Sequence, residues 1–206
     1  MIKYFIRTTG QRKLNSSYNQ VEYSLLVDKE HKPIESFIRQ LIEISNYDAV
    51  LLEDDVRLCR NFKEEIEKVI SEHPNDIINF FYAPKKWFTS YYTTDFAYNQ
   101  CTYYPKGKAK ILAETIEEIY KTKKVNGYDV LEMFALQKLG WTNYVYRPCL
   151  VQHIDRHSII MGTDMIRRVT PFFKDYLDEL HIDYMDTKAI YDSYDILMEM
   201  VKKDVG

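Results

Sequence analysis

Residues 48–57, Asp-Ala-Val-Leu-Leu-Glu-Asp-Asp-Val-Arg, place three consecutive carboxylates directly after a run of apolar residues. The apolar run is typical of a strand that is buried inside a covered sheet. The three acids, Glu53, Asp54 and Asp55, repel one another unless a cation neutralises them. The simplest such cation is a divalent metal, so the end of this strand is the first candidate functional site.

The chain has 206 residues, of which 46% are hydrophobic, and this suits one domain with or without a small appendage. No apolar run approaches the length of a membrane span, and the first seven residues are too soon interrupted by charge for a signal peptide. Three cysteines favour a reducing compartment and buried thiols over a disulfide framework. We therefore expect a soluble cytoplasmic protein without a membrane partner.

Strands and helices alternate along the predicted chain. The hydrophobic pattern predicts strands at residues 2–8, 21–27, 49–52, 76–82, 96–104 and 141–146, and helices at 33–44, 61–70, 109–120 and 129–139. Asn61 is the expected cap of the second helix. This order predicts an α/β fold with a mostly parallel sheet and helices on both faces. The alternation spans residues 1–160, and residues 161–206 are predicted to form a helical extension that packs on this part of the chain or covers its site.

The segment at residues 147–158 is the second candidate site. Cys149, His153 and His157 are spaced by four, which on a helix would put three zinc-type ligands on one face. Pro148 and the β-rich residues before it argue against a helix. We favour His153 at the end of a late strand, where its imidazole could complete a metal site begun by the carboxylates. The alternative is a structural histidine.

These residues resemble a known family. A strand that ends in Glu-Asp-Asp, an aromatic strand before a helix, and a later Pro-x-Leu-Val-Gln-His-Ile segment with a serine soon after look like nucleotide-sugar glycosyltransferases of the GT-A (Rossmann-like) fold. The resemblance covers residues 1–160 in element order and is sharp at residues 53–55 and 148–158. It implies that residues 1–160 form a nucleotide-sugar-binding and catalytic domain. The family's acidic motif, usually Asp-x-Asp, binds Mn²⁺ or Mg²⁺ and the donor ribose. The resemblance implies that Asp55 and His153 bind the metal.

The resemblance also implies a donor site. Glu53 and Asp54 would contribute to it, with Asp54 on the ribose or the metal. Thr8, Thr9 and Asp28, at the ends of the first two strands, would meet the nucleobase and ribose of a UDP-sugar such as UDP-glucose. A metal that bridges the two phosphates stabilises the leaving group most in the transition state.

Arginines just beyond His153 are candidates for holding diphosphate oxygens, although ordinary surface solvation is the favoured explanation for each of them taken singly. They are Arg156, Arg167 and Arg168. The chain has six glycines, none of them in a dinucleotide-binding or P-loop pattern, which argues against those two ligand classes.

An inverting transfer needs a base for the acceptor hydroxyl. By resemblance to inverting members, Asp129 is the candidate, and Asp95 is the second choice. Asp129 through Glu132 also fits a reciprocal helix-capping box, so the role of Asp129 as base or cap stays open.

The acceptor is the least constrained part of the prediction. Residues 81–124 contain eight lysines against four acids, and aromatic residues lie between them. This composition leaves a hydroxymethylated DNA base, as in phage-type DNA modification, as one possible acceptor beside a cytosolic glycan or a protein. A phage-encoded enzyme of this kind would act in the host cytoplasm. The net charge of −3 argues against nucleic-acid binding by the molecule as a whole. Other classes that fit are a metal-dependent phosphoesterase using His153 and His157, and a non-catalytic nucleotide-sugar or glycan-binding module.

Overall fold

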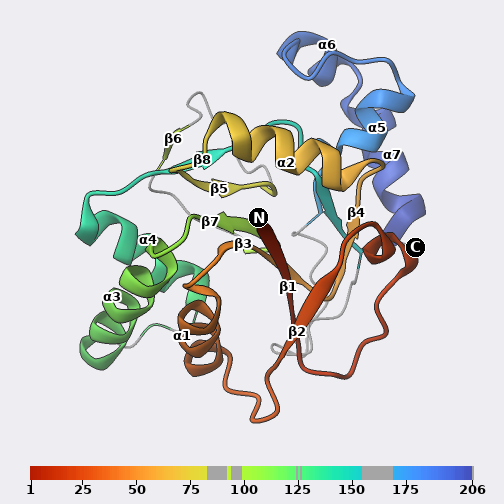
Figure 1. Ribbon diagram of the computed structural model, residues 1–206. Helices are drawn as coiled ribbons and strands as arrows, with labels where there is room; N and C mark the ends of the chain where they lie inside the picture. Colours follow the sequence, from red (N-terminus) through yellow and green to blue (C-terminus); the bar gives the residue numbers. More distant parts are fainter. Residues whose placement is uncertain (83–91, 94–98, 124, 126, 155–168, 206) are drawn as a thin grey trace.

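The fold of the computed structural model is α/β, as predicted, and helices cover both faces of its central sheet (Figure 1). The structure describes residues 1–82, 92–93, 99–123, 125, 127–154 and 169–205. The strands are β1 (Ile2–Thr8), β2 (Tyr23–Val27), β3 (Asp48–Glu53), β4 (Val56–Leu58), β5 (Ile77–Asn79), β6 (Tyr92–Thr93), β7 (Cys101–Tyr104), β8 (Asn143–Val145) and β9 (Val151–His153). The helices are the 3₁₀-helix η1 (Ser16–Gln20) and α1 (Pro33–Ile44), α2 (Phe62–Glu72), α3 (Lys108–Thr122), α4 (Tyr128–Leu139), α5 (Lys174–Glu179), α6 (Thr187–Asp192) and α7 (Tyr194–Val205).

The main sheet of the described residues has the strand order β2-β1-β3-β7-β5-β8-β6. β1 pairs in parallel with β2 and β3, and β5 pairs in parallel with β8. β7 is antiparallel to both of its neighbours, β3 and β5, and β6 is antiparallel to β8. β1, β2, β3, β5 and β8 therefore run in one direction, and β7 and β6 run in the other. The prediction of a mostly parallel sheet is confirmed.

Alternation along the strands divides the core between the two faces of the sheet. Phe5 and Leu51 face α1, α3 and α4, and pack with residues such as Phe37. Ile6 and Leu52, one position further along their strands, face α2 and the C-terminal helices. Figure 1 shows the same division, with α1, α3 and α4 on one side of the sheet and α2 on the other.

A separate two-stranded ribbon, β4 with β9, lies outside the main sheet. The strands are antiparallel, and Val56 lies opposite His153. β9 confirms the strand that we favoured for His153, and Cys149 lies in a β-bridge, so neither residue belongs to the zinc-type helix that Pro148 argued against. His157 lies outside the described residues.

The C-terminal helices pack into the core on the α2 side of the sheet through Tyr176, Leu177, Ile190, Leu197 and Val201. The predicted domain boundary at residue 160 falls on residues that the structure does not describe. No helix among the described residues is both long and apolar enough to cross a membrane.

Asn61 is the N-cap residue of α2, as predicted, but its side chain does not cap the helix. Its backbone is left-handed, with φ of 55°, and its side chain makes no capping hydrogen bond. The side chain of Gln20 instead accepts from the N–H of Phe62 at 3.0 Å. A distant residue thus satisfies one of the free N–H groups of this helix end.

Candidate functional site

The carboxyl ends of β1, β2 and β3 meet at one edge of the sheet. Thr8 lies opposite Val27 in the register, and Arg7 lies opposite Glu53. The N–H of Asp28 donates to the carbonyl oxygen of Thr8 at 2.8 Å, which fixes Asp28 beside the end of β1. This edge is where ligands bind in open α/β sheets.

Asp55 and His153, the two predicted metal ligands, are in contact at this edge. His153 Nε2 lies 3.2 Å from Asp55 Oδ2, and both residues are buried. The ribbon accounts for the contact, because the N–H of Ile154 donates to the carbonyl oxygen of Asp55 at 3.0 Å, next to the Val56 and His153 pair. Two predicted residues from distant parts of the sequence therefore share one site.

Arg12 is a site residue that the sequence analysis missed. Its Nη1 lies 3.2 Å from Asp54 Oδ1 and 3.2 Å from Asp55 Oδ2, so one guanidinium joins two carboxylates. Burial raises the pKa of Asp54 above its ordinary value, against hydrogen bonds from Thr8 and Arg12 that lower it, and the charge of Asp55 adds to the rise. The positive charge beside these two acids therefore comes from Arg12, in the loop after β1.

The residues present suit a hard divalent cation. Two carboxylates and an imidazole are ligands that Mn²⁺ accepts, and carboxylates also suit Mg²⁺. His153 Nδ1 is buried and has no hydrogen-bond partner in the described part of the chain. In that same part of the chain, no group of three or more His, Cys, Asp or Glu side chains is arranged so that it could hold a metal ion. Metal binding would require Arg12 to give up its position between the carboxylates.

Glu53 does not join Asp54 and Asp55. Its Oε1 accepts a hydrogen bond from Tyr128 Oη at 2.5 Å and lies 3.6 Å from Arg7 Nη1. Arg7 packs over the rings of Phe37 and Tyr128, at 4.8 Å and 4.3 Å from the centroids, and its Nε donates to Gln40 at 2.8 Å. These contacts place Glu53 on the α1 and α4 side of the sheet. Tyr128 and Arg7 give its carboxylate protein partners, so its position does not depend on a donor ligand.

Thr8, Thr9 and Asp28 surround the end of β1. Thr8 and Asp28 are buried, and Thr8 Oγ1 accepts from the N–H of Gly10 at 2.8 Å. Asp28 Oδ1 accepts from the N–H of Lys32 at 3.4 Å. The hydroxyl of Thr9 is buried and has no hydrogen-bond partner among the residues described. Thr8 also makes a side-chain hydrogen bond to Asp54, so the three predicted donor-binding residues lie next to the acidic pair.

Asp129 lies in the first turn of α4. Its Oδ1 accepts from the N–H of Val130 at 2.9 Å, and a Cβ at Gly127 would come within 2.6 Å of the same oxygen. The predicted capping box is wrong, because Glu132 points into the core instead of reaching back to Asp129. The neighbouring Tyr128 binds Glu53, so α4 begins beside the end of β3.

Glu132 is a buried acid that the sequence analysis assigned only to the cap. It accepts hydrogen bonds from Tyr104 Oη at 2.9 Å and from Asn99 Nδ2 at 2.8 Å. Burial raises the pKa of Glu132 to about 8, although these hydrogen bonds lower it. Its spacing from Ala135 and Leu136, which are also buried, was the available signal for a core position.

Several predicted residues lie outside the described part of the chain. They are Asp95, Arg156, Arg167 and Arg168. Of the lysines considered for DNA, Lys110 and Lys121 pair with glutamates on α3, and Lys108 and Lys123 lie over the rings of Trp141 and Phe134. Lys121 lies in the last turn of α3, where cations favour the helix dipole.

No known family model matches this sequence, and no curated protein matches it. Among solved structures, the crystal structure of A197 from STIV is similar, with 16% sequence identity and a TM-score of 0.44. The match covers 73% of this chain and 83% of that one.

Proposed function

We propose that this protein is a glycosyltransferase of the GT-A type, which moves a sugar from a nucleoside-diphosphate sugar to an acceptor hydroxyl with the help of Mn²⁺ or Mg²⁺. The observation that carries the proposal is the 3.2 Å contact between Asp55 Oδ2 and His153 Nε2 at the carboxyl edge of β1, β2 and β3. An apolar strand that delivers acids to a ligand-binding edge, with an imidazole brought to them by another element, is the arrangement that a metal-assisted transfer needs.

Asp55 and His153 are the proposed metal ligands, and Asp54 is the neighbouring carboxylate that Arg12 holds beside them. When bound, the metal neutralises the charge that grows on the diphosphate leaving group. Arg12 has a second use in this scheme. A guanidinium freed from the two carboxylates can bind the same diphosphate oxygens in its planar fork.

Thr8, Thr9 and Asp28 are the proposed contacts for the nucleoside. They lie where β1 and β2 end, next to Asp54. The hydroxyl of Thr9 and the carboxylate of Asp28 offer the donor and acceptor groups that a ribose or a base edge requires. Glu53 is left out of the donor site because Tyr128 and Arg7 already bind it.

Asp129 is the proposed base for the acceptor hydroxyl. It is partly exposed at the start of α4, whereas Glu132, the other acid of this helix turn, is fully buried and out of reach of an acceptor. A carboxylate that takes the proton from the attacking oxygen suits an inverting transfer. The proposed acceptors are a glycan, a protein or a modified DNA base.

A thermal-shift screen of UDP-, GDP- and ADP-sugars with and without Mn²⁺ tests the proposal. A donor at about 100 times its Kd adds about 2.7 kcal/mol to the free energy of unfolding, which corresponds to a rise of roughly 5–10 °C in Tm for a chain of this size. We expect the rise for one donor class and only with metal. Equal melting temperatures with every donor would contradict the proposal.

The acceptor classes separate by salt dependence. Transfer to DNA would fall steeply between 50 and 200 mM salt, because binding to phosphates releases counterions. Transfer to a small glycan would change little over this range. Phosphate release from phosphoesters without any acceptor would instead indicate the phosphoesterase alternative.

A further inference from the structure

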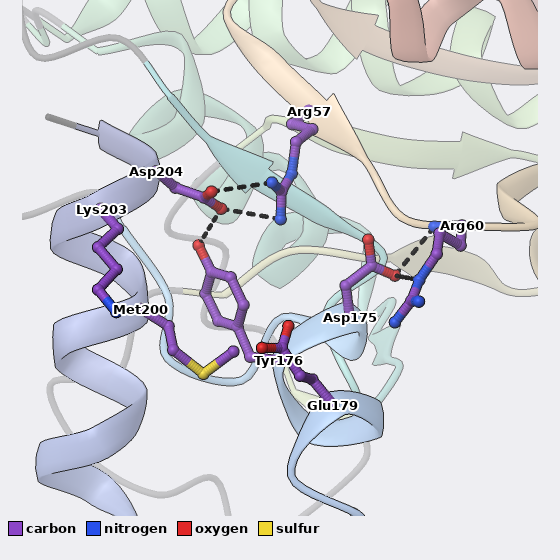
Figure 2. Close-up of a pocket in the computed structure, with 8 residues that line it drawn as sticks. All are labelled: Arg57, Arg60, Asp175, Tyr176, Glu179, Met200, Lys203 and Asp204. Carbon is purple, nitrogen blue, oxygen red and sulfur yellow. Dashed lines mark hydrogen bonds and ion pairs between the residues drawn. The ribbon is translucent and has the colours of Figure 1, made fainter.

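The last helix, α7, binds the β4 and β9 ribbon, which contains His153 and begins directly after Asp55. Arg57 of β4 binds Asp204 of α7 through two contacts, Nη1 to Oδ1 at 2.9 Å and Nη2 to Oδ2 at 2.8 Å. Figure 2 shows this pair at the wall of a pocket, with Tyr176 of α5 pointing at the same carboxylate. Parallel bonds between a guanidinium and a carboxylate fix orientation as well as distance.

The hydrogen-bond network around Asp204 also reaches β9, the other strand of the ribbon. Gln152 lies opposite Arg57 in the register, and its Nε2 donates to the carbonyl oxygen of Thr170 at 2.7 Å and to Tyr176 Oη at 3.3 Å. Tyr176 Oη in turn donates to Asp204. The guanidinium of Arg57 also packs over the ring of Phe173, at 4.7 Å from its centroid. Asp204 therefore reaches both strands, directly through Arg57 and by way of Tyr176.

The position of this network matters because the ribbon is short. Its two strands have three residues each, and an isolated two-stranded pair is at best marginally stable in water. Arg57 is two residues from Asp55, and Gln152 is the neighbour of His153. A shift of either strand would change the Asp55 to His153 distance.

We infer that Asp204 is a positioning residue, which through Arg57 and Tyr176 fixes the β4 and β9 ribbon and so keeps Asp55 and His153 at contact distance. The inference rests on the candidate site of the proposed function, but the geometry can be tested without any donor or metal. An isolated, half-exposed ion pair contributes little. This one is bidentate and has a third partner in Tyr176.

Hydrogen exchange in the full-length chain provides the test. The N–H of Ile154 donates to Asp55, and the N–H of Cys59 donates to Leu150, so these two amides report on the two ends of the ribbon. We expect Asp204→Asn to speed their exchange at least tenfold and to leave the Leu51 amide of β3 unchanged. Asp192→Asn, which breaks the exposed ion pair of α6 with Lys188, is the matched control and should change neither.

A second readout separates positioning from folding. If Asp55 and His153 bind Mn²⁺, Asp204→Asn should weaken the metal Kd about tenfold, as loss of an outer support does, and Asp204→Glu should restore part of it. Unchanged exchange at Ile154 and Cys59 would overturn the inference, and so would an equal acceleration at Leu51. Faster ribbon exchange in a protein that binds no Mn²⁺ would uphold the positioning role and count against the proposed function instead.

Discussion

Tyr128 Oη donates to Glu53 Oε1 at 2.5 Å, and this bond separates Glu53 from the two acids that follow it. Asp54 and Asp55 share Arg12 on the other side, with His153 against Asp55. Three consecutive carboxylates thus have two different tasks. One stabilises the packing of α4 on the sheet, and two form the candidate site.

Tyr128→Phe should therefore destabilise the protein without affecting ligand binding. A partly buried hydrogen bond to a charged group contributes about 2 kcal/mol, so urea unfolding should give a loss of that order. Tyr120→Phe removes an exposed bond to Glu35 and is the control, with an expected loss below about 0.5 kcal/mol. Equal losses in the two variants would contradict this role for Glu53.

Glu132 should make stability fall as pH rises. Its pKa is about 8 in the folded protein and near 4.5 when unfolded, so the folded state holds a proton that the unfolded state has lost between these values. The stability from this group is complete below about pH 4.5 and is lost as pH rises to about 8.

Glu132→Gln tests this dependence, because glutamine resembles the protonated acid. At pH 8 the variant should be more stable than the parent by a few kcal/mol, and near pH 4.5 the two should be equal; chemical denaturation at both values measures the difference. A parent protein whose stability rises over this interval, with no difference from the variant, would rule out the buried proton.

Arg12→Gln should have opposite effects on metal and nucleotide. Removing the guanidinium takes one positive charge away from beside Asp54 and Asp55, so Mn²⁺ should bind several-fold more tightly. UDP should bind several-fold more weakly, because a diphosphate contact is lost. Calorimetry with each ligand measures both, with Arg60→Gln, an exposed arginine away from the site, as the control. Weaker binding of both ligands would indicate a purely structural Arg12.

Asp129→Asn should slow the reaction without loosening the fold. A general base contributes roughly 10²- to 10⁴-fold, so kcat for UDP release from UDP-glucose, with water as the acceptor, should fall by that factor while Tm stays nearly constant. Gly127→Ala should lower kcat by a smaller factor, because the new Cβ would displace Asp129 Oδ1. A large fall in Tm for Asp129→Asn, with kcat retained, would assign Asp129 to helix stability.

Local pattern predicted the parts of this protein that depend on local physics. The acidic end of β3 and the strand character of β9 follow from hydrophobic runs and from Pro148. The contact of Asp55 with His153 was reached by combining the strand-end rule with a family resemblance. Alternation along β3 also placed Glu53 on the face of Leu51, a signal that the sequence analysis did not use.

The remaining site residues depend on partners that sequence spacing does not reveal. Arg12 comes from a loop, and its role appears only once that loop lies over Asp54. The Asp-x-x-Glu spacing predicts a capping box that includes Glu132. In the structure Glu132 is instead buried in the core, where it accepts hydrogen bonds from Tyr104 and Asn99. Tertiary hydrogen bonds outweighed local capping in this case.

The most direct test of the central claim is calorimetric titration of UDP, with and without Mn²⁺, into the parent protein, Asp55→Ala and Asp76→Ala. Asp76 makes another carboxylate contact to a histidine, His73, at 3.3 Å, and so provides a matched control outside the site. We predict that UDP binds the parent and Asp76→Ala only when Mn²⁺ is present, and that Asp55→Ala abolishes this binding. UDP binding that is indifferent to both Mn²⁺ and Asp55→Ala would contradict the account.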